Sequence, residues 1–285
     1  RGGLQWFWFL MASQLYSGLA AHKPQVSNMG IMLLSAAWMI EGRRLGWAAF
    51  FLAMIGNFKL QPFPAVALLA LVELLFRPRA WKWIGILLGS VGFWFALPWM
   101  FRPWGYLREQ HFLWLDSLRR YSEECFDFYD NVFAFLGNNF EPKMSFATSQ
   151  IFSMGFAFGC AAILTLWCIY RRSGKTAYPS GIFLALILGT TYTVLVSPLQ
   201  QISAYVLLAP LFLALALLRA EVPRVWTLPV LVTFFGLTIV YSGLIPEPLR
   251  GVFRHAVLRV PFTLAGFVGV VWVWFSRGEL ENLDT

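Results

Sequence analysis

Charge is what this sequence has least of. Only 13% of its 285 residues are charged, and Asp and Glu together number 14. A soluble globular domain has about 25% charged and about 45–50% apolar residues, whereas this chain is 59% hydrophobic. The composition therefore excludes an ordinary soluble domain and predicts an integral membrane protein.

The residues that several chemistries require are also missing. The three cysteines form neither a C-x-x-C pair nor another spacing typical of metal ligands. The sequence contains no glycine-rich loop of the kind that cradles nucleotide phosphates. We therefore expect no metal and no cofactor. The net charge of +8 does not indicate nucleic-acid binding, because the basic residues gather between apolar runs.

Long apolar runs are what the sequence has in abundance. A helix needs about 20 predominantly apolar residues to cross a hydrocarbon core of ~30 Å. The runs that we identify lie at 4–20, 26–41, 46–58, 62–76, 82–101, 149–170, 177–196, 202–218, 225–243 and 258–275. The sequence thus predicts an all-α fold, a polytopic bundle of about ten transmembrane helices in which residues 1–285 form a single domain.

Basic residues follow every second apolar run. They are Arg43, Arg44, Arg77, Arg79, Lys82, Arg171, Arg172, Lys175, Arg219, Arg224 and Arg277. Because cytoplasmic connections contain an excess of Lys and Arg, these connections are predicted to be cytoplasmic. The intervening connections, predicted to face outward, are 22–25, 57–61, 102–148, 197–201 and 244–257. We expect a multi-pass protein of the cell membrane with its active side outward.

The connection 102–148 is long enough to form structure of its own. Phe112, Leu115 and Leu118 recur there at helical spacing, with charged residues between them. This amphipathic pattern predicts a helix near 106–124 that lies on the outer membrane surface.

Polar residues lie directly beside apolar runs in the outward connections. The run 46–58 spans only about 20 Å, so the polar residues at its end are predicted to lie below the outer membrane surface. These residues are Asn57, Lys59 and Gln61. An ammonium that faces hydrocarbon is costly, and Pro62 frees backbone carbonyls that are tolerated at membrane depth only where they line a cavity. We therefore expect a water-filled outward cavity that contains a cation; snorkelling of Lys59 to the headgroups is the alternative.

Two further outward corners have the same character. Gln25 and Asn28 stand on one helix face where the second apolar run opens. Gln200 and Gln201 follow Pro198 before the eighth run. Ordinary helix capping is the alternative for each residue by itself, but three such corners on one side favour a shared binding site.

One carboxylate lies inside an apolar run. Glu73 precedes Arg77 by four residues near the predicted cytoplasmic end, and this spacing predicts an ion pair on one helix face. We interpret the two residues as a local pair within their helix.

Three stretches of the sequence resemble a known family. The first, KPQVSN from Lys23 to Asn28, is similar to a Gly-Gln-Val-Asn opening of a leucine-rich helix. The second runs from Gly42 through a helix rich in Ala and Gly to Lys59-Leu-Gln-Pro62, and then through an apolar helix to a basic turn. The third, SPLQQISAY, begins at Ser197. In this order they resemble the polyprenol-phosphate-mannose-dependent mannosyltransferases of glycosyltransferase family 87, in the GT-C superfamily.

This resemblance implies a GT-C-like membrane glycosyltransferase of the cell envelope. It would move a sugar, mannose in the family, from a polyprenyl-phosphate donor to a glycolipid or glycan acceptor on the outer face, among membrane lipids. Lys59 would neutralise the leaving phosphate. The side chains that would bind the substrate are those of Gln25, Asn28, Asn57, Gln200 and Gln201.

The sequence also departs from that family. Pro24 stands where the family usually has a glycine before the glutamine. Members of the superfamily have their catalytic carboxylate in the first outward loop, yet the connections 22–25 and 57–61 contain no acidic residue. The resemblance therefore leads us to expect the general base, and at least one further helix, upstream of Arg1.

Two other classes of protein stay open. A transporter or flippase of a lipid-linked or anionic solute would also have an outward cavity with a buried cation. Such a protein typically shows two similar halves with broken helices at matching positions, and we find no such symmetry. A non-catalytic membrane subunit would need no cavity, and its corner residues would be helix caps.

Overall fold

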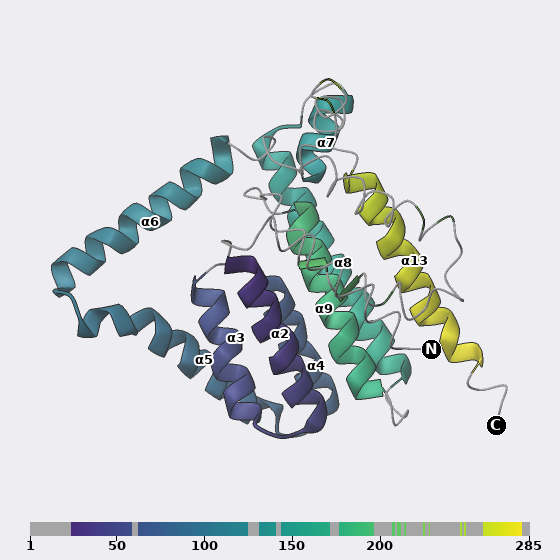
Figure 1. The fold of residues 1–285 in the computed structure, drawn as a ribbon, viewed down its shortest axis with the longest axis horizontal. Coiled ribbons are helices and arrows are strands. Elements are labelled where there is room, and N and C mark those ends of the chain that lie inside the picture. The colour runs from purple at the N-terminus through teal and green to yellow at the C-terminus, as the bar shows by residue number, and fades with distance from the viewer. Residues whose placement is uncertain are drawn as a thin grey trace.

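A computed structural model places most of the chain in helices (Figure 1). It describes residues 24–58, 62–124, 131–140, 144–171, 177–196 and 259–280, with single positions between 207 and 248. The helices are α2 (Pro24–Glu41), α3 (Leu45–Phe58), α4 (Phe63–Phe76), α5 (Ala80–Ala96), the 3-10 helix η1 (Leu97–Met100), α6 (Trp104–Glu124), α7 (Val132–Asn139), α8 (Phe146–Arg171), α9 (Ala177–Val196) and α13 (Arg259–Leu280). No strand occurs in the described ranges, and the predicted all-α class is confirmed.

Several of these helices suit a membrane. Three segments are long and apolar enough to cross one, namely α5 continued by η1, α8 and α9, and shorter apolar helices lie within α3, α4 and α13. Along α8, large apolar side chains such as Ile151, Phe158 and Leu166 are exposed, as expected of a face that contacts lipid. The fold is therefore a membrane helix bundle, whereas the number of spans stays a prediction.

The helix bounds follow the apolar runs closely. Each of α2, α3, α4, α8, α9 and α13 overlaps one run, and α5 with η1 overlaps another. The runs 4–20, 202–218 and 225–243 lie outside the described residues, apart from single positions. For the described helices, hydrophobic segmentation of the sequence was therefore enough to locate the elements.

The helices α4 and α9 pack against each other in opposite directions. Gly189 lies so close to α4 that an added Cβ would stand 2.3 Å from the Cα of Ala65. Further along, a Cβ on Gly181 would stand 3.4 Å from side-chain atoms of Val72 and Phe76. Small residues let helix backbones approach this closely inside a membrane. The glycines of α9 thus set the distance between the two helices.

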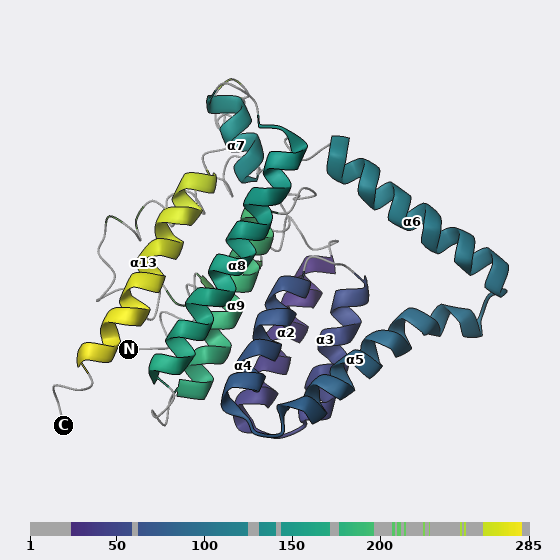
Figure 2. The ribbon, with the colours of Figure 1, turned by 180° about the vertical axis from the view of Figure 1, so that it is seen from behind.

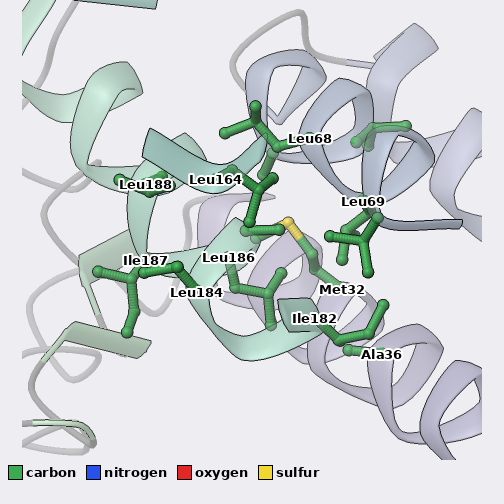
Figure 3. Packing of buried hydrophobic residues seen from close by; sticks show 14 of the residues in the cluster. Met32, Ala36, Leu68, Leu69, Leu164, Ile182, Leu184, Leu186, Ile187 and Leu188 are labelled. Carbon is green, nitrogen blue, oxygen red and sulfur yellow. The ribbon is translucent and has the colours of Figure 1, made fainter. Parts of the chain in front are cut away.

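The main core contains buried side chains from α2, α3, α4, α5, α8, α9 and α13. Figure 3 shows part of this core, with labelled side chains from four helices: Met32 and Ala36 from α2, Leu68 and Leu69 from α4, Leu164 from α8, and Ile182, Leu184, Leu186, Ile187 and Leu188 from α9. Inside a membrane there is little hydrophobic driving force between helices, so van der Waals packing of this kind holds them together.

Hydrogen bonds between helices show which helix ends lie together. Near the start of both α3 and α5, the Trp83 indole Nε1 donates to the Leu45 carbonyl at 3.1 Å. Near the ends of the same two helices, Asn57 Nδ2 lies 3.5 Å from the Val91 carbonyl. These two helices therefore run in the same direction, and both begin beside the turn that follows α4.

The bundle consequently has two distinct ends. We call the end where α2 and α4 begin, and where α3 and α9 finish, the polar end. The other end, which contains the turns 42–44 and 77–79, is the basic end. Because α8 runs antiparallel to α9, Arg171 at its last residue also lies at the basic end. The basic connections at Arg43, Arg77 and Arg171 thus share one end, and the side of the membrane that this end faces stays a prediction.

A helix occupies the part of the long connection where the sequence predicts one near 106–124. This helix, α6, is drawn clear of the other long helices in both views (Figure 1, Figure 2). Its exposed surface includes aromatic residues such as Trp104 and Phe112 as well as the charged pair Arg119–Glu123, whose side chains meet at 3.0 Å. Its position on the outer membrane surface stays a prediction.

The second helix of the connection, α7, was not predicted. Asn131 caps it, because its side-chain Oδ1 accepts a hydrogen bond from the Ala134 amide at 2.9 Å. A small second core forms where α7 meets the end of α9 and the start of α13; it contains Val132, Phe133, Ala134, Leu195, Val196 and Val260. Within the connection 102–148, α7 therefore packs against the bundle at the polar end.

Candidate functional site

The polar end brings together the ends of several helices whose flanking sequences are polar. Asn28 lies in the second turn of α2 and is 6% exposed, so its amide is almost fully removed from solvent. At the same end α3 finishes with Asn57 and Phe58, and α4 begins. Because α9 packs antiparallel to α4, the last residues of α9 also lie at this end.

The corner between α3 and α4 has the broken helix that the sequence predicts. α3 ends at Phe58, Pro62 is the N-cap of α4, and Pro64 stands in the first turn of α4, where a missing N–H costs no hydrogen bond. The ring of Phe63 lies against Gly56, at 3.1 Å from where a Cβ would stand. This contact packs the first residue of α4 against the last turn of α3.

The side chain of Asn57 points towards α5. Its Nδ2 donates to the Ala53 carbonyl at 2.9 Å and lies 3.5 Å from the Val91 carbonyl. These contacts hold the amide in one orientation against α5. Its Oδ1 is therefore the Asn57 atom that can accept a hydrogen bond from a substrate hydroxyl.

The last turns of α9 contain polar residues that were not among the predicted site residues. Thr190, Thr191 and Thr193 are all buried. Two of them bond to the preceding turn, since Thr190 Oγ1 donates to the Leu186 carbonyl at 2.7 Å and Thr193 Oγ1 to the Gly189 carbonyl at 2.9 Å. The Thr191 hydroxyl is buried without a hydrogen-bond partner among the described residues. The TTYT stretch at 190–193, set in an apolar run, was the signal available in the sequence.

The structure describes only part of the predicted site. Asn28 and Asn57 are both placed at the polar end, and Gln25 lies in the first turn of α2. The remaining predicted residues, Lys59, Gln200 and Gln201, lie outside the described residues. The close contact of Ala65 with Gly189 places the start of α4 and the last turns of α9 at one end of this helix pair. The cavity itself stays a prediction.

A buried ionic cluster lies at the basic end, and the sequence predicted only half of it. The Glu73 side chain is 0% exposed, and its Oε2 lies 3.4 Å from Arg77 Nε, as the spacing predicts. The unforeseen partner is Tyr178 in the first turn of α9, whose hydroxyl donates to Glu73 Oε1. Arg77 also donates to the Met39 carbonyl of α2 at 3.0 Å, and its guanidinium stands 4.6 Å from the Tyr178 ring centre. The cluster therefore joins three helices.

The described residues offer no group of His, Cys, Asp or Glu that could hold a metal ion. Cys160 and Cys168 are buried in α8 without a disulfide partner. The polar side chains described at the polar end are amides and hydroxyls, which hydrogen-bond to polyols.

The chain matches a known family of glycosyltransferases. The model of glycosyltransferase family 87 matches residues 2–198. The matched range contains the α2 opening, the corner between α3 and α4, the connection 102–148 and the whole of α9. No curated protein and no solved structure matched the chain.

Proposed function

Because the match over residues 2–198 shows that the chain belongs to glycosyltransferase family 87, we propose that this membrane glycosyltransferase uses a polyprenyl-phosphate sugar as its donor. Mannose is the sugar that we propose, and a lipid or glycan on the outer face of the cell membrane is the acceptor. The family match is the observation that supports the proposal most directly. The shared location of the polar helix ends supports it from the structure.

Glycosyl transfer from such a donor makes two demands on the protein. The bond between the sugar C1 and the phosphate oxygen breaks, so negative charge grows on the leaving phosphate and has to be stabilised. The acceptor oxygen forms the new bond to C1 and gives its proton to a general base. We propose that Lys59, a compact positive charge that precedes α4 in the sequence, stabilises the charge on the leaving phosphate. The base remains unassigned.

Recognition of the sugar requires hydrogen-bonding groups that are held in place. We propose that Asn28 and Asn57, together with Gln25, Gln200 and Gln201, bind the sugar hydroxyls. The orientation of Asn57, fixed by its bond to the Ala53 carbonyl, supports this role. The donor's polyprenyl chain is apolar, and it would lie among the helices, which explains why a lipid-linked donor suits an enzyme built from apolar helices.

A transporter and a non-catalytic subunit are not favoured as alternatives. A family of glycosyltransferases matches most of the chain, and the sequence shows no pair of similar halves of the kind found in transporters.

The test is a transfer assay in membranes that contain the full-length protein. Radiolabelled polyprenyl-phosphate-mannose, polyprenyl-phosphate-glucose and a nucleotide-linked mannose are supplied in turn with a lipid extract as acceptor. We expect transfer from the first donor, and Lys59→Met should lower its rate at least ~10²-fold, the scale for loss of one preorganised partner of a developing anion.

The matched control for charge is Lys175→Met, in a basic connection at the predicted cytoplasmic side, which should transfer normally. Normal rates with Lys59→Met would refute the role given to that lysine. Transfer from the nucleotide sugar but from neither lipid-linked donor would refute the donor class, whatever the lysine variant does.

A further inference from the structure

The two turns at the basic end lie against each other. The turn 42–44 joins α2 to α3, and the turn 77–79 joins α4 to α5. Arg77 of the second turn reaches the Met39 carbonyl beside the first, and a Cβ on Gly42 would stand 3.7 Å from Arg77 Nη2. The bond from the Trp83 indole to the Leu45 carbonyl joins the helices that follow. The basic residues of both turns therefore belong to one surface.

Four cations of this surface have no acidic partner among the described residues. They are Arg43, Arg44, Arg79 and Lys82, and all four are exposed; we call them the basic face. The ion pairs of the described residues are Arg77–Glu73, Arg119–Glu123 and Arg120–Asp116. Arg77 is thus already paired with the buried carboxylate of Glu73. Within the described ranges, Glu41 is the exposed carboxylate near the four other cations, and it pairs with none of them.

Tryptophan side chains flank the basic face. The Arg44 guanidinium lies 5.8 Å from the Trp38 ring centre, and the Lys82 ammonium lies 5.5 Å from that of Trp81. Trp47 and Trp81 are 57% and 66% exposed, although their rings are large and apolar. Exposed tryptophan at the end of a membrane helix is typical of the headgroup level of a bilayer. Tryptophans at that level would bring the four cations to the depth of the lipid phosphates.

We propose that the basic face binds the phosphate groups of anionic phospholipids in the leaflet at this end of the bundle. Charge complementarity favours an anionic lipid over a neutral one, because the described part of this face has four cations and one exposed carboxylate. The flanking tryptophans select a bilayer rather than a soluble anion, since a free phosphate would gain nothing from rings at headgroup depth. α3 and α5 both begin at this surface, and their first backbone N–H groups add favourable donors.

This surface is separate from the proposed sugar-transfer site. α4 joins the two ends, and its 14 residues extend about 21 Å at 1.5 Å per residue. The proposal therefore does not rest on the proposed function. It would remain if the enzyme used a different sugar or donor.

The test is lipid binding to the full-length protein in detergent, measured by native mass spectrometry. Dioleoylphosphatidylglycerol is titrated as the anionic probe and dioleoylphosphatidylcholine as the neutral-charge probe. Each cation near such a surface changes affinity about fivefold. Arg43→Gln combined with Lys82→Gln should therefore weaken phosphatidylglycerol binding about 25-fold, and phosphatidylcholine binding should stay unchanged.

Two further variants make the result specific. Arg119→Gln with Arg120→Gln removes the same charge from α6 and should leave phosphatidylglycerol binding as it was. Arg43→Lys with Lys82→Arg keeps the charge, and it should bind like the unchanged protein. The proposal is overturned if the first double variant binds phosphatidylglycerol normally, if it loses both lipids equally, or if the α6 variant loses as much.

Discussion

Glu73 has no contact with solvent, and its two carboxylate oxygens serve two different partners. Oε2 faces Arg77, the C-cap of α4, and Oε1 accepts a hydrogen bond from the Tyr178 hydroxyl of α9. A carboxylate in such a place is tolerated only when it is paired, because an isolated buried charge is strongly unfavourable. At the scale of single residues, the pair that looks local in the sequence is therefore part of the contact between helices.

This arrangement predicts unequal costs for removing its members. Arg77→Gln leaves the buried carboxylate without its cation and should lower the free energy of unfolding by about 3–5 kcal/mol. Tyr178→Phe removes one hydrogen bond and should lower it by about 1–3 kcal/mol. Thermal unfolding of the purified protein in detergent measures both changes. The neighbouring exposed Arg79→Gln is the control, expected within about ±0.5 kcal/mol; equal stability of Arg77→Gln and this control would contradict the cluster.

At the scale of elements, the pair α4–α9 depends on one close approach. The backbone of Gly189 lies against Ala65, whereas the glycines of α8 at 155 and 159 have open space around them. The same residue type therefore has different roles in neighbouring helices. In α9 it permits helix contact, and in α8 it occupies a face that is open.

Substitution by alanine should separate these two roles. Gly189→Ala places a Cβ inside the backbone of α4 and should lower the free energy of unfolding by about 1–3 kcal/mol, the usual cost of overpacking. Gly155→Ala meets no neighbour and should be neutral or stabilising by up to about 1 kcal/mol, because alanine favours a helix over glycine. The measurement is the unfolding midpoint of each variant in the same detergent, compared with that of the unchanged protein. A Gly189→Ala protein as stable as Gly155→Ala would show that the helices do not pack this closely.

At the scale of the whole molecule, the structure separates a polar end from a basic end. Basic connections gather at one end, as the alternation along the sequence predicts, and α7 covers part of the other. The positive-inside rule assigns the basic end to the cytoplasm. Sugar transfer at the polar end would then take place on the outer side of the membrane.

Accessibility from outside intact cells tests this orientation. With Cys125→Ser as background, Ser117→Cys in α6 should react with a membrane-impermeant maleimide added outside. Gly174→Cys, in the basic connection after α8, should react only after the cells are opened. Labelling of Gly174→Cys in intact cells would reverse the orientation and move the polar end to the cytoplasm.

The sequence by itself determined the elements and their order. Apolar runs located α2 to α5, α8, α9 and α13, because only a helix satisfies its backbone hydrogen bonds within one apolar segment. Pro62 and Pro64 located the break after α3, because proline lacks the backbone N–H that a helix interior requires. The basic residues predicted which connections lie together, since charge distribution along the chain is a property of sequence.

Only the tertiary structure decided how those helices meet. Tyr178 is separated from Glu73 by about a hundred residues in sequence, and no local pattern predicts such a partner. The contact of Gly189 with Ala65 depends on how the two helices cross. The sequence of each helix shows only that a small residue there allows a close approach. The docking of α7 over the end of α9 likewise depends on apolar residues from three separate segments. Long-range contacts of this kind are fixed by packing in three dimensions, whereas periodicity and charge report only what each segment can do alone.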